Sequence, residues 1–263
     1  MTQTIVGVNV DDFRLAPKDA LRRAADLAFR SIALATVEGD LAPANLGRSG
    51  RRHLARLVDG LGLRLDSLVA DMPALRFTDP HTVQERVERT CQIIELAADM
   101  RVPTVTSTLG MVAHPDTNEL SPNAIEALRT IGEFADSRDT RFAVSPSRDA
   151  GERLVSLLEE IACDAVRVSF DPAAIVMRGT NPLAAIERFI GEVVVVQARD
   201  GTAGGRDHPG NEARLGEGDV DWYSVVAAMQ ASDFRGPYVL RSADSANPVA
   251  DVHQARKYLE KAF

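Results

Sequence analysis

The sequence predicts an α/β fold, a single (β/α)8 barrel, and three observations support this fold class. Short β-branched runs alternate with amphipathic stretches along the chain, which is typical of βα units around a parallel sheet. Eight such units can be counted, and 263 residues with 45% hydrophobic residues suffice for one barrel of this kind. No linker, low-complexity tract or shift in composition indicates a second domain, so residues 1–263 are expected to form one domain.

In the first half of the chain, apolar runs predict four strands and helical periodicity predicts three helices. The strands are expected at residues 4–10, 31–37, 63–69 and 102–107, and the helices at 17–29, 50–61 and 80–100. The first helix would place Leu21, Ala24 and Ala28 on one face. Asp79-Pro80 predicts the start of the third helix, because Asp is a good N-cap residue and proline is tolerated in the first turn.

The second half repeats the alternation. Strands are expected at residues 141–145, 166–171, 193–197 and 238–242, and helices at 121–136, 150–162, from 181 onward, 220–231 and 248–262. Ser121-Pro122 and Asn181-Pro182 mark two of the helix starts. The apolar run from Val193 to Val196 predicts a parallel strand buried on both faces. An open doubly wound sheet is the alternative, but no GxGxxG motif follows the first strand and eight units exceed what that fold needs.

The charge balance and the hydropathy exclude several kinds of partner. The chain has 38 acidic and 30 basic residues and a formal charge of -8, so neither a nucleic acid nor an anionic membrane is an expected partner. No stretch approaches the roughly eighteen apolar residues of a transmembrane helix, and the first residues lack the basic and apolar regions of a secretory signal. A cytoplasmic protein with a small-molecule ligand is therefore expected.

Cysteine and lysine usage excludes further chemistry. Cys91 and Cys163 are far apart and show no CxxC spacing, so neither a disulfide framework nor a structural zinc is indicated. The only lysines are Lys18, Lys257 and Lys261, which all lie in or beside expected helices. A Schiff-base aldolase is excluded, because it needs a lysine that projects from a strand into the pocket.

Side-chain alternation predicts where the chemistry lies. In a barrel of this kind the active site forms at the carboxyl ends of the strands, and residues two apart along a strand share a face. Four neighbouring strands end in an inward-pointing polar residue by this parity: Ser145, Asp171, Gln197 and Arg241. The sequence therefore predicts that these four side chains meet in one site.

Several short motifs in the second half resemble those of one family. The seventh strand ends with Gln197-Ala198-Arg199-Asp200, and its loop ends with Leu215-Gly216-Glu217-Gly218-Asp219. Phe170-Asp171-Pro172 and the segment from Gly236 to Arg241 mark two further strand ends. These segments are similar to the sugar isomerase/epimerase family of xylose isomerase-like TIM barrels, in which the seventh strand usually ends His-Leu-Lys-Asp and its loop Leu-Gly-Glu-Gly-Asp. The resemblance implies a TIM barrel that acts as a sugar or sugar-phosphate isomerase or epimerase.

The resemblance also implies a divalent metal, held in the family by a Glu, an Asp, a His and a Glu at the ends of strands five to eight. This sequence has Ser145, Asp171, Gln197 and Arg241 at those places. A divalent cation prefers carboxylate oxygens and imidazole nitrogens, whereas an arginine repels a cation and cannot ligate it. We therefore expect no metal and no other cofactor there, and we expect Arg241 to pair with Asp171.

Other polar residues of the seventh loop and of the fourth are expected near the ligand. Arg199, Arg206, His208 and Glu217 are candidate ligand-binding residues. Gly201 to Gly205 with Arg206 resembles a phosphate-binding loop, although glycines there are also consistent with loop flexibility alone. His114 and His208 are either substitute metal ligands or bases, or ordinary surface histidines.

Three functions remain open. The first is a metal-dependent sugar or sugar-phosphate isomerase or epimerase, although most of the metal ligands are missing. The second is a non-catalytic barrel, in which Asp171 and Arg241 form a structural ion pair. The third is a metal-free enzyme with Arg241 as the electrophile and Asp171 or His208 as the base. In the last two cases a small anionic or hydroxylated ligand, such as a sugar phosphate, is expected between Arg241, Gln197 and the seventh loop.

Overall fold

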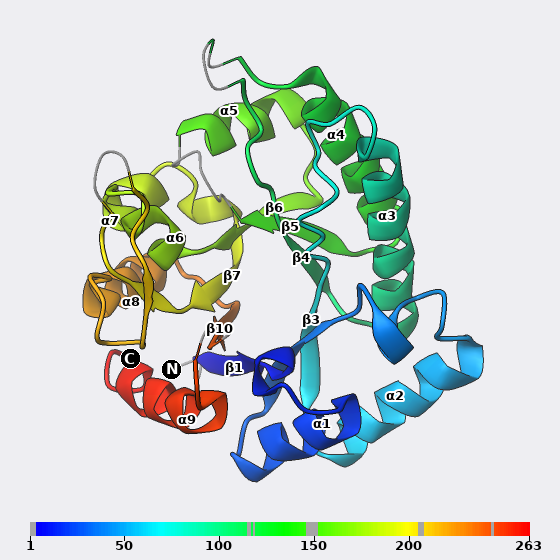
Figure 1. Ribbon diagram of the computed structural model, residues 1–263, viewed down its shortest axis with the longest axis vertical. Helices are drawn as coiled ribbons and strands as arrows, with labels where there is room; N and C mark the ends of the chain where they lie inside the picture. Colours follow the sequence, from blue (N-terminus) through cyan, green and yellow to red (C-terminus); the bar gives the residue numbers. More distant parts are fainter. Residues whose placement is uncertain (1–3, 115–116, 118, 146–151, 205–207, 243–244) are drawn as a thin grey trace.

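The chain folds into a closed barrel of eight parallel strands with helices between them, a (β/α)8 TIM barrel, as the sequence predicted. The computed structural model describes residues 4–114, 117, 119–145, 152–204, 208–242 and 245–263. Figure 1 shows the helices as a ring around the strands. Among the described helices, none is long and apolar enough to cross a membrane.

Eight strands form the barrel and two short strands form a separate ribbon. The barrel strands are β1 (Ile5–Asn9), β2 (Ser31–Ala35), β3 (Arg64–Val69), β4 (Thr104–Thr108), β5 (Arg141–Ser145), β6 (Val166–Phe170), β7 (Val193–Ala198) and β10 (Pro237–Leu240). They pair in chain order, and β10 closes the barrel by pairing in parallel with β1. The antiparallel ribbon, β8 (Asp200–Gly201) with β9 (Glu212–Ala213), lies in the loop after β7.

The helices surround the barrel in chain order. They are α1 (Pro17–Asp26), α2 (Arg48–Gly60), α3 (Val83–Met100), α4 (Pro122–Asp136), α5 (Glu152–Ile161), α6 (Pro172–Val176), α7 (Pro182–Ile186), α8 (Trp222–Ala231) and α9 (Pro248–Leu259). Short 3-10 turns occur at η1 (Val10–Phe13), η2 (Gly39–Leu41) and η3 (Ile190–Glu192). The starts predicted from Ser121-Pro122 and Asn181-Pro182 are confirmed, since α4 and α7 begin at these prolines.

The strands bury apolar side chains on both faces. Phe142 and Val144 are fully buried in the large core cluster beneath the helices. The inward faces carry a second, smaller cluster of Ala33, Val69, Val195 and Val239. Because side chains alternate, Gln197 lies two residues beyond Val195 on the same face, and Arg241 lies two beyond Val239. The polar residues at the strand ends therefore sit on an apolar barrel interior.

Two local expectations differ from the structure. α3 begins at Val83 and not at Pro80, because Oδ1 of Asp79 accepts a hydrogen bond from the backbone N of His81 (2.9 Å) and so forms a turn of its own. α6 was also not predicted, although Asp171-Pro172 is an N-cap residue followed by proline, the pattern that marks other helix starts in this chain; α6 follows β6 at once and has Asp171 as its N-cap residue. This short helix fixes how the Asp171 carboxylate is oriented at the mouth of the barrel.

Candidate functional site

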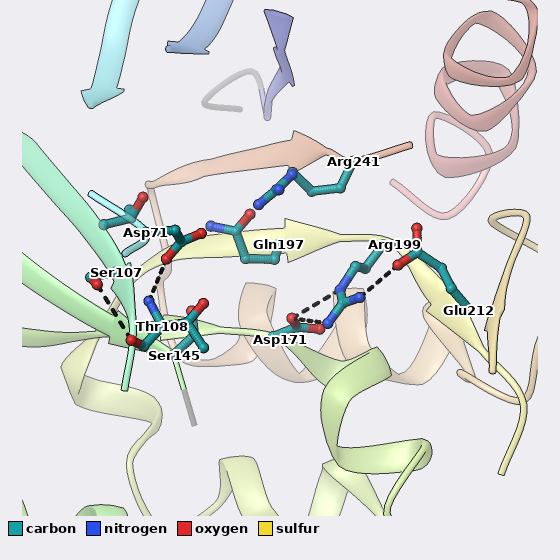
Figure 2. Close-up of a pocket in the computed structure, with 10 residues that line it drawn as sticks. Asp71, Ser107, Thr108, Ser145, Asp171, Gln197, Arg199, Glu212 and Arg241 are labelled. Carbon is teal, nitrogen blue, oxygen red and sulfur yellow. Dashed lines mark hydrogen bonds and ion pairs between the residues drawn. The ribbon is translucent and has the colours of Figure 1, made fainter. Parts of the chain in front are cut away.

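A pocket of about 140 Å3 lies at the carboxyl ends of the barrel strands. It is lined by Asp71, Thr106, Ser107, Thr108, Ser145, Asp171, Gln197, Arg199, Glu212 and Arg241. Figure 2 shows these side chains around the pocket, with dashed lines for the bonds among them. Every lining residue carries a polar side chain, so the pocket suits a hydrophilic or charged ligand.

The alternation of side chains along the strands correctly predicted that four of these residues meet in one place. Ser145, Asp171, Gln197 and Arg241 come from the ends of four neighbouring strands, and all of them line the pocket. The first three are buried, with 6–8% of each residue exposed. The ion pairs that these residues form, however, are not the predicted ones.

Asp171 pairs with Arg199 and not with Arg241, which corrects the sequence-based prediction. Oδ2 of Asp171 accepts hydrogen bonds from Nε (3.0 Å) and Nη2 (2.8 Å) of Arg199. Oδ1 accepts a hydrogen bond from the backbone N of Ala174 (3.0 Å), as expected for an N-cap carboxylate at the start of α6. Both carboxylate oxygens are thus engaged, and Asp171 belongs to the wall of the pocket instead of acting as a free base.

Arg199 joins Asp171 to a second carboxylate. Its Nη1 donates a hydrogen bond to Oε2 of Glu212 at 2.7 Å. Burial opposes the guanidinium charge, but the charges of Asp171 and Glu212 and the hydrogen bonds to them outweigh it and raise the pKa of Arg199 above its ordinary value. Glu212 reaches the pocket because β9 folds back onto β8. No sequence pattern indicated this ribbon, so Glu212 was not among the predicted site residues.

Arg241 is held by Asp12, from the opposite end of the chain. Nε of Arg241 donates to Oδ2 of Asp12 at 3.3 Å, and the same oxygen accepts a hydrogen bond from the backbone N of Ser242 at 2.8 Å. Oδ1 of Asp12 accepts from Nδ2 of Asn9 at 2.8 Å, so this carboxylate is fixed before a ligand binds. Among the described residues, neither Nη atom of Arg241 has a hydrogen-bond partner. Both can therefore donate to a ligand in the pocket.

Gln197 presents an unsatisfied amide group to the site. Nε2 donates to Oγ of Ser169 at 2.8 Å, whereas Oε1 is buried and has no hydrogen-bond partner in the described part of the chain. A buried acceptor without a donor costs about 1–3 kcal/mol. Figure 2 shows this amide between Asp71 and Arg241, so a ligand hydroxyl in the pocket would relieve the cost.

Asp71 is a pocket carboxylate that was not predicted. Oδ1 accepts a hydrogen bond from the backbone N of Thr108 at 2.7 Å, and Oδ2 has no partner among the residues that the structure describes. Arg86 is buried nearby and donates to Oγ of Ser107. Burial lowers the pKa of Arg86 to about 10, and the charge of Asp71 partly offsets this effect. Strand parity could have revealed Asp71, which lies two residues beyond the inward-facing Val69.

Asp200 organises the loop that follows β7. It is completely buried, and its carboxylate accepts hydrogen bonds from the backbone N of Gly201 (2.8 Å), Gly216 (2.9 Å) and Val220 (3.1 Å). A Cβ at Gly218 would lie 2.2 Å from Oδ1 of Asp200, so no larger residue fits there. The Leu-Gly-Glu-Gly-Asp motif that carried the family resemblance therefore has a structural role in this chain.

The described part of the glycine-rich segment does not form the phosphate-binding loop that the sequence suggested. The backbone N–H groups of residues 201–203 already donate within the loop, to Asp200, Asn211 and Asp219. A Cβ at Gly204 would lie 2.5 Å from a backbone nitrogen across the loop. Glycine is needed here because the two sides of the loop pack closely.

Three of the remaining predicted residues are not brought to the pocket. Glu217 and His208 are exposed, and neither lines it. His114 is also exposed and does not line the pocket, and its Nδ1 accepts a hydrogen bond from the backbone N of Thr117 at 3.4 Å. Arg206 lies outside the described residues. Of the predicted loop residues that the structure describes, Arg199 is thus the one that reaches the site.

The residues at the four strand ends do not fit the divalent metal that the family resemblance implies. Ser145 and Gln197 offer neutral oxygens, Arg241 adds a positive charge, and Asp171 is engaged by Arg199. In the described ranges, no group of three His, Cys, Asp or Glu side chains is placed to hold a metal ion. A hard dication would find here neither enough oxygen ligands nor the negative charge to compensate it.

Several solved structures share this fold over nearly the whole chain. A xylose isomerase domain protein from Planctomyces limnophilus is 18% identical and has a TM-score of 0.85, covering 99% of this chain and 96% of that chain. An L-ribulose 3-epimerase is 18% identical with a TM-score of 0.79, covering 99% and 96%. A xylose isomerase-like TIM barrel protein from Mycobacterium smegmatis, in complex with magnesium, is 15% identical with a TM-score of 0.77, covering 98% and 96%. At these identities the likeness shows the fold and not the reaction.

Sequence comparison identifies the family. A search of curated proteins found no match. The family model described as xylose isomerase-like TIM barrel matches residues 21–262, a range that contains every barrel strand except β1 and all the lining residues of the pocket. The chain therefore belongs to the xylose isomerase-like TIM barrel family.

Proposed function

We propose that the pocket binds a small hydroxylated anion, such as a sugar acid or a sugar phosphate, and isomerises or epimerises it without a divalent metal. The observation that carries this proposal is the position of Arg241. Its guanidinium stands where the family resemblance implies a metal ligand, and among the described residues its two Nη atoms have no partner. A planar guanidinium with two free donors suits a carboxylate or a phosphate.

Arg241 would act as the electrophile of a metal-independent reaction. Sugar isomerisation removes a proton from a carbon next to a carbonyl group, and negative charge then develops on the carbonyl oxygen. In a hydroxy acid this carbonyl oxygen belongs to the carboxylate that Arg241 binds, so the Nη groups of Arg241 can stabilise the developing charge in place of a metal. Because Asp12 already fixes the guanidinium through Nε, little reorganisation is needed when the charge develops.

Asp71 is the carboxylate best placed to move the proton. The other two carboxylates of the pocket, Asp171 and Glu212, are bound to Arg199. Oδ2 of Asp71 has no partner among the described residues, so it can accept the proton from the carbon next to the carbonyl; returning this proton to the former carbonyl carbon, while the hydroxyl proton moves to the former carbonyl oxygen, completes an isomerisation. This assignment replaces Asp171 and His208, the bases suggested by the sequence.

The wall of the pocket offers groups that can form hydrogen bonds with a hydroxylated ligand. Oε1 of Gln197 needs a donor, which a ligand hydroxyl can supply, and Ser145 offers a hydroxyl on the adjoining wall. The solved L-ribulose 3-epimerase shares the fold, so an isomerase or epimerase reaction is consistent with the barrel. The pocket therefore combines an anion-binding cation, a proton acceptor and hydroxyl-binding groups.

Calorimetric titration in the presence of EDTA tests the binding part of the proposal. Glycerate and 3-phosphoglycerate should bind to the native protein, and Arg241→Met should weaken at least one of them about tenfold or more, because a charge-assisted pair is lost. Arg235→Met is the matched control, since the Arg235 side chain is 59% exposed and does not line the pocket. Unchanged affinity in Arg241→Met would contradict the proposal.

Deuterium exchange tests the reaction. In D2O with EDTA, NMR should detect deuterium entering the carbon-bound positions of at least one member of a panel of aldoses, ketoses, sugar acids and sugar phosphates. Asp71→Asn should abolish this exchange while the ligand still binds. Exchange that requires added Mn2+ would contradict a metal-free reaction, and binding without any exchange would favour a non-catalytic ligand-binding barrel.

A further inference from the structure

The pocket continues into a larger hollow on the side of Asp71. This second hollow measures about 440 Å3, lies between the loops that follow β3 and β4, and shares Asp71 and Thr108 with the pocket. The pocket itself, at about 140 Å3, is comparable to a cavity that holds one benzene molecule. A ligand with more than about six heavy atoms must therefore extend beyond the pocket, and the hollow beside Asp71 offers the space.

Half of the residues that line the second hollow carry apolar side chains, namely Met72, Pro73, Leu75, Leu109 and Met111, and the polar side chains of the lining are Asp71, Arg76, Thr78 and Thr108. Met72 and Leu109 are buried, whereas Met111 is 39% exposed and is one of the few large apolar residues on the described surface. A methionine at the edge of a binding site adapts to ligands of different shape. Apolar side chains beside a polar pocket offer a contact surface for an apolar group of the same ligand.

The opposite side of the pocket is polar. A third hollow of about 260 Å3 shares Glu212 and Arg241 with the pocket, and Arg214 and Asp251 are among its lining residues. The pocket thus has the Nη donors of Arg241 on one side and the partly apolar second hollow beyond Asp71. A ligand that spans the pocket and the second hollow would place its negative group on Arg241 and an apolar group beside Met111.

We propose that the ligand is an amphiphilic hydroxy acid, whose carboxylate binds Arg241 and whose apolar substituent lies against Leu75 and Met111. This inference rests on the anion site of the proposed function and narrows its substrate class. An apolar substituent that lies against Leu75 and Met111 would be removed from water together with the apolar surface of these two side chains, whereas the extra hydroxyl groups of an unsubstituted sugar would not gain from that surface. Selectivity for the substituted acid is the measurable consequence.

Glycerate and 3-phenyllactate are suitable probes, because both carry a carboxylate and a 2-hydroxyl group and only the second carries a phenyl ring. In calorimetric titrations of the native protein, 3-phenyllactate should bind about tenfold more tightly, as expected if roughly 60 Å2 of apolar surface becomes buried. In the Leu75→Asn, Met111→Gln variant this advantage should vanish, while the affinity for glycerate stays the same. Leu15→Gln is the matched control, because Leu15 is 45% exposed and lies outside the pocket and the second hollow.

The outcomes separate this inference from the proposed function. Equal affinity for the two probes, or an advantage of 3-phenyllactate that survives in the Leu75→Asn, Met111→Gln variant, would overturn the amphiphilic ligand and leave the anion site standing. No binding of either probe would overturn the anion site and this inference with it. Arg241→Met should weaken both probes by a similar factor, and unchanged affinities would show that the carboxylate does not bind there.

Discussion

Replacing Arg199 with methionine tests the ion pairing in the wall of the pocket. The substitution leaves the carboxylates of Asp171 and Glu212 without their cation, and their side chains are only 9% and 16% exposed. Removing one partner of a buried ion pair costs about 3–5 kcal/mol. Because the Arg199 side chain is 23% exposed, water partly compensates the loss. We expect a decrease of about 3 kcal/mol in the free energy of unfolding.

A double-mutant cycle shows which arginine is coupled to Asp171. Combining Arg199→Met with Asp171→Leu should recover much of the loss and give a coupling energy of about 2 kcal/mol, whereas the cycle with Arg241→Met should give a value near zero. Urea unfolding can be followed by the fluorescence of Trp222, the one tryptophan of the chain, which is fully buried. A coupling of Asp171 to Arg241 as large as that to Arg199 would refute this pairing.

Three further outcomes are expected. Gly218→Ala should destabilise the fold by about 2 kcal/mol in urea unfolding, because its Cβ would meet Oδ1 of Asp200 at 2.2 Å, whereas Gly191→Ala, with no atom within 4 Å, should be neutral; equal effects would contradict this. Desolvation by the surrounding residues, followed by the charge of Asp12, raises the pKa of Asp11 to about 6, so the folded protein holds this proton more tightly than the unfolded chain; because Asp11 is exposed to solvent, the resulting fall in stability as the pH rises from about 4 to about 6 should be small. The fall should be smaller in Asp11→Asn, and an identical pH profile would count against it. Asp12→Asn should weaken glycerate binding about tenfold in calorimetry, because the Arg241 guanidinium loses the carboxylate that holds it in position. An unchanged affinity would show that glycerate binding does not depend on the ion pair between Asp12 and Arg241.

The barrel and its four strand-end residues were predictable because both depend on periodicity. Eight alternations of apolar runs with helical stretches correspond to the eight barrel strands. The period of two along a strand then places Ser145 and Gln197 on the inward face, whatever their partners are. The same rule places Asp71 on the inward face at the end of β3, so Asp71 could also have been predicted from the sequence.

The ion pairs were not predictable, because they depend on turns that carry no periodic signal. The short helix α6 turns Asp171 towards Arg199, and the 3-10 turn η1 brings Asp12 to Arg241, 229 positions away in the chain. The alternation of side chains along a strand shows on which face a charged side chain lies, but it does not show with which residue that side chain forms an ion pair. The sequence of the loop motif likewise indicated a functional role, although Gly218 makes room for the buried Asp200 and Gly216 packs against the ring of Tyr258.

We propose that Arg241 stands in place of a metal ligand and that the site works without a divalent ion. Calorimetric titration of Mn2+ into the native protein and into the Ser145→Glu, Gln197→His, Arg241→Glu variant tests this claim most directly. We expect no saturable binding to the native protein and about one site per chain in the variant, where carboxylates and an imidazole could join Asp171 as ligands. Tight binding of about one Mn2+ per native chain, abolished by Asp171→Ala, would contradict the claim.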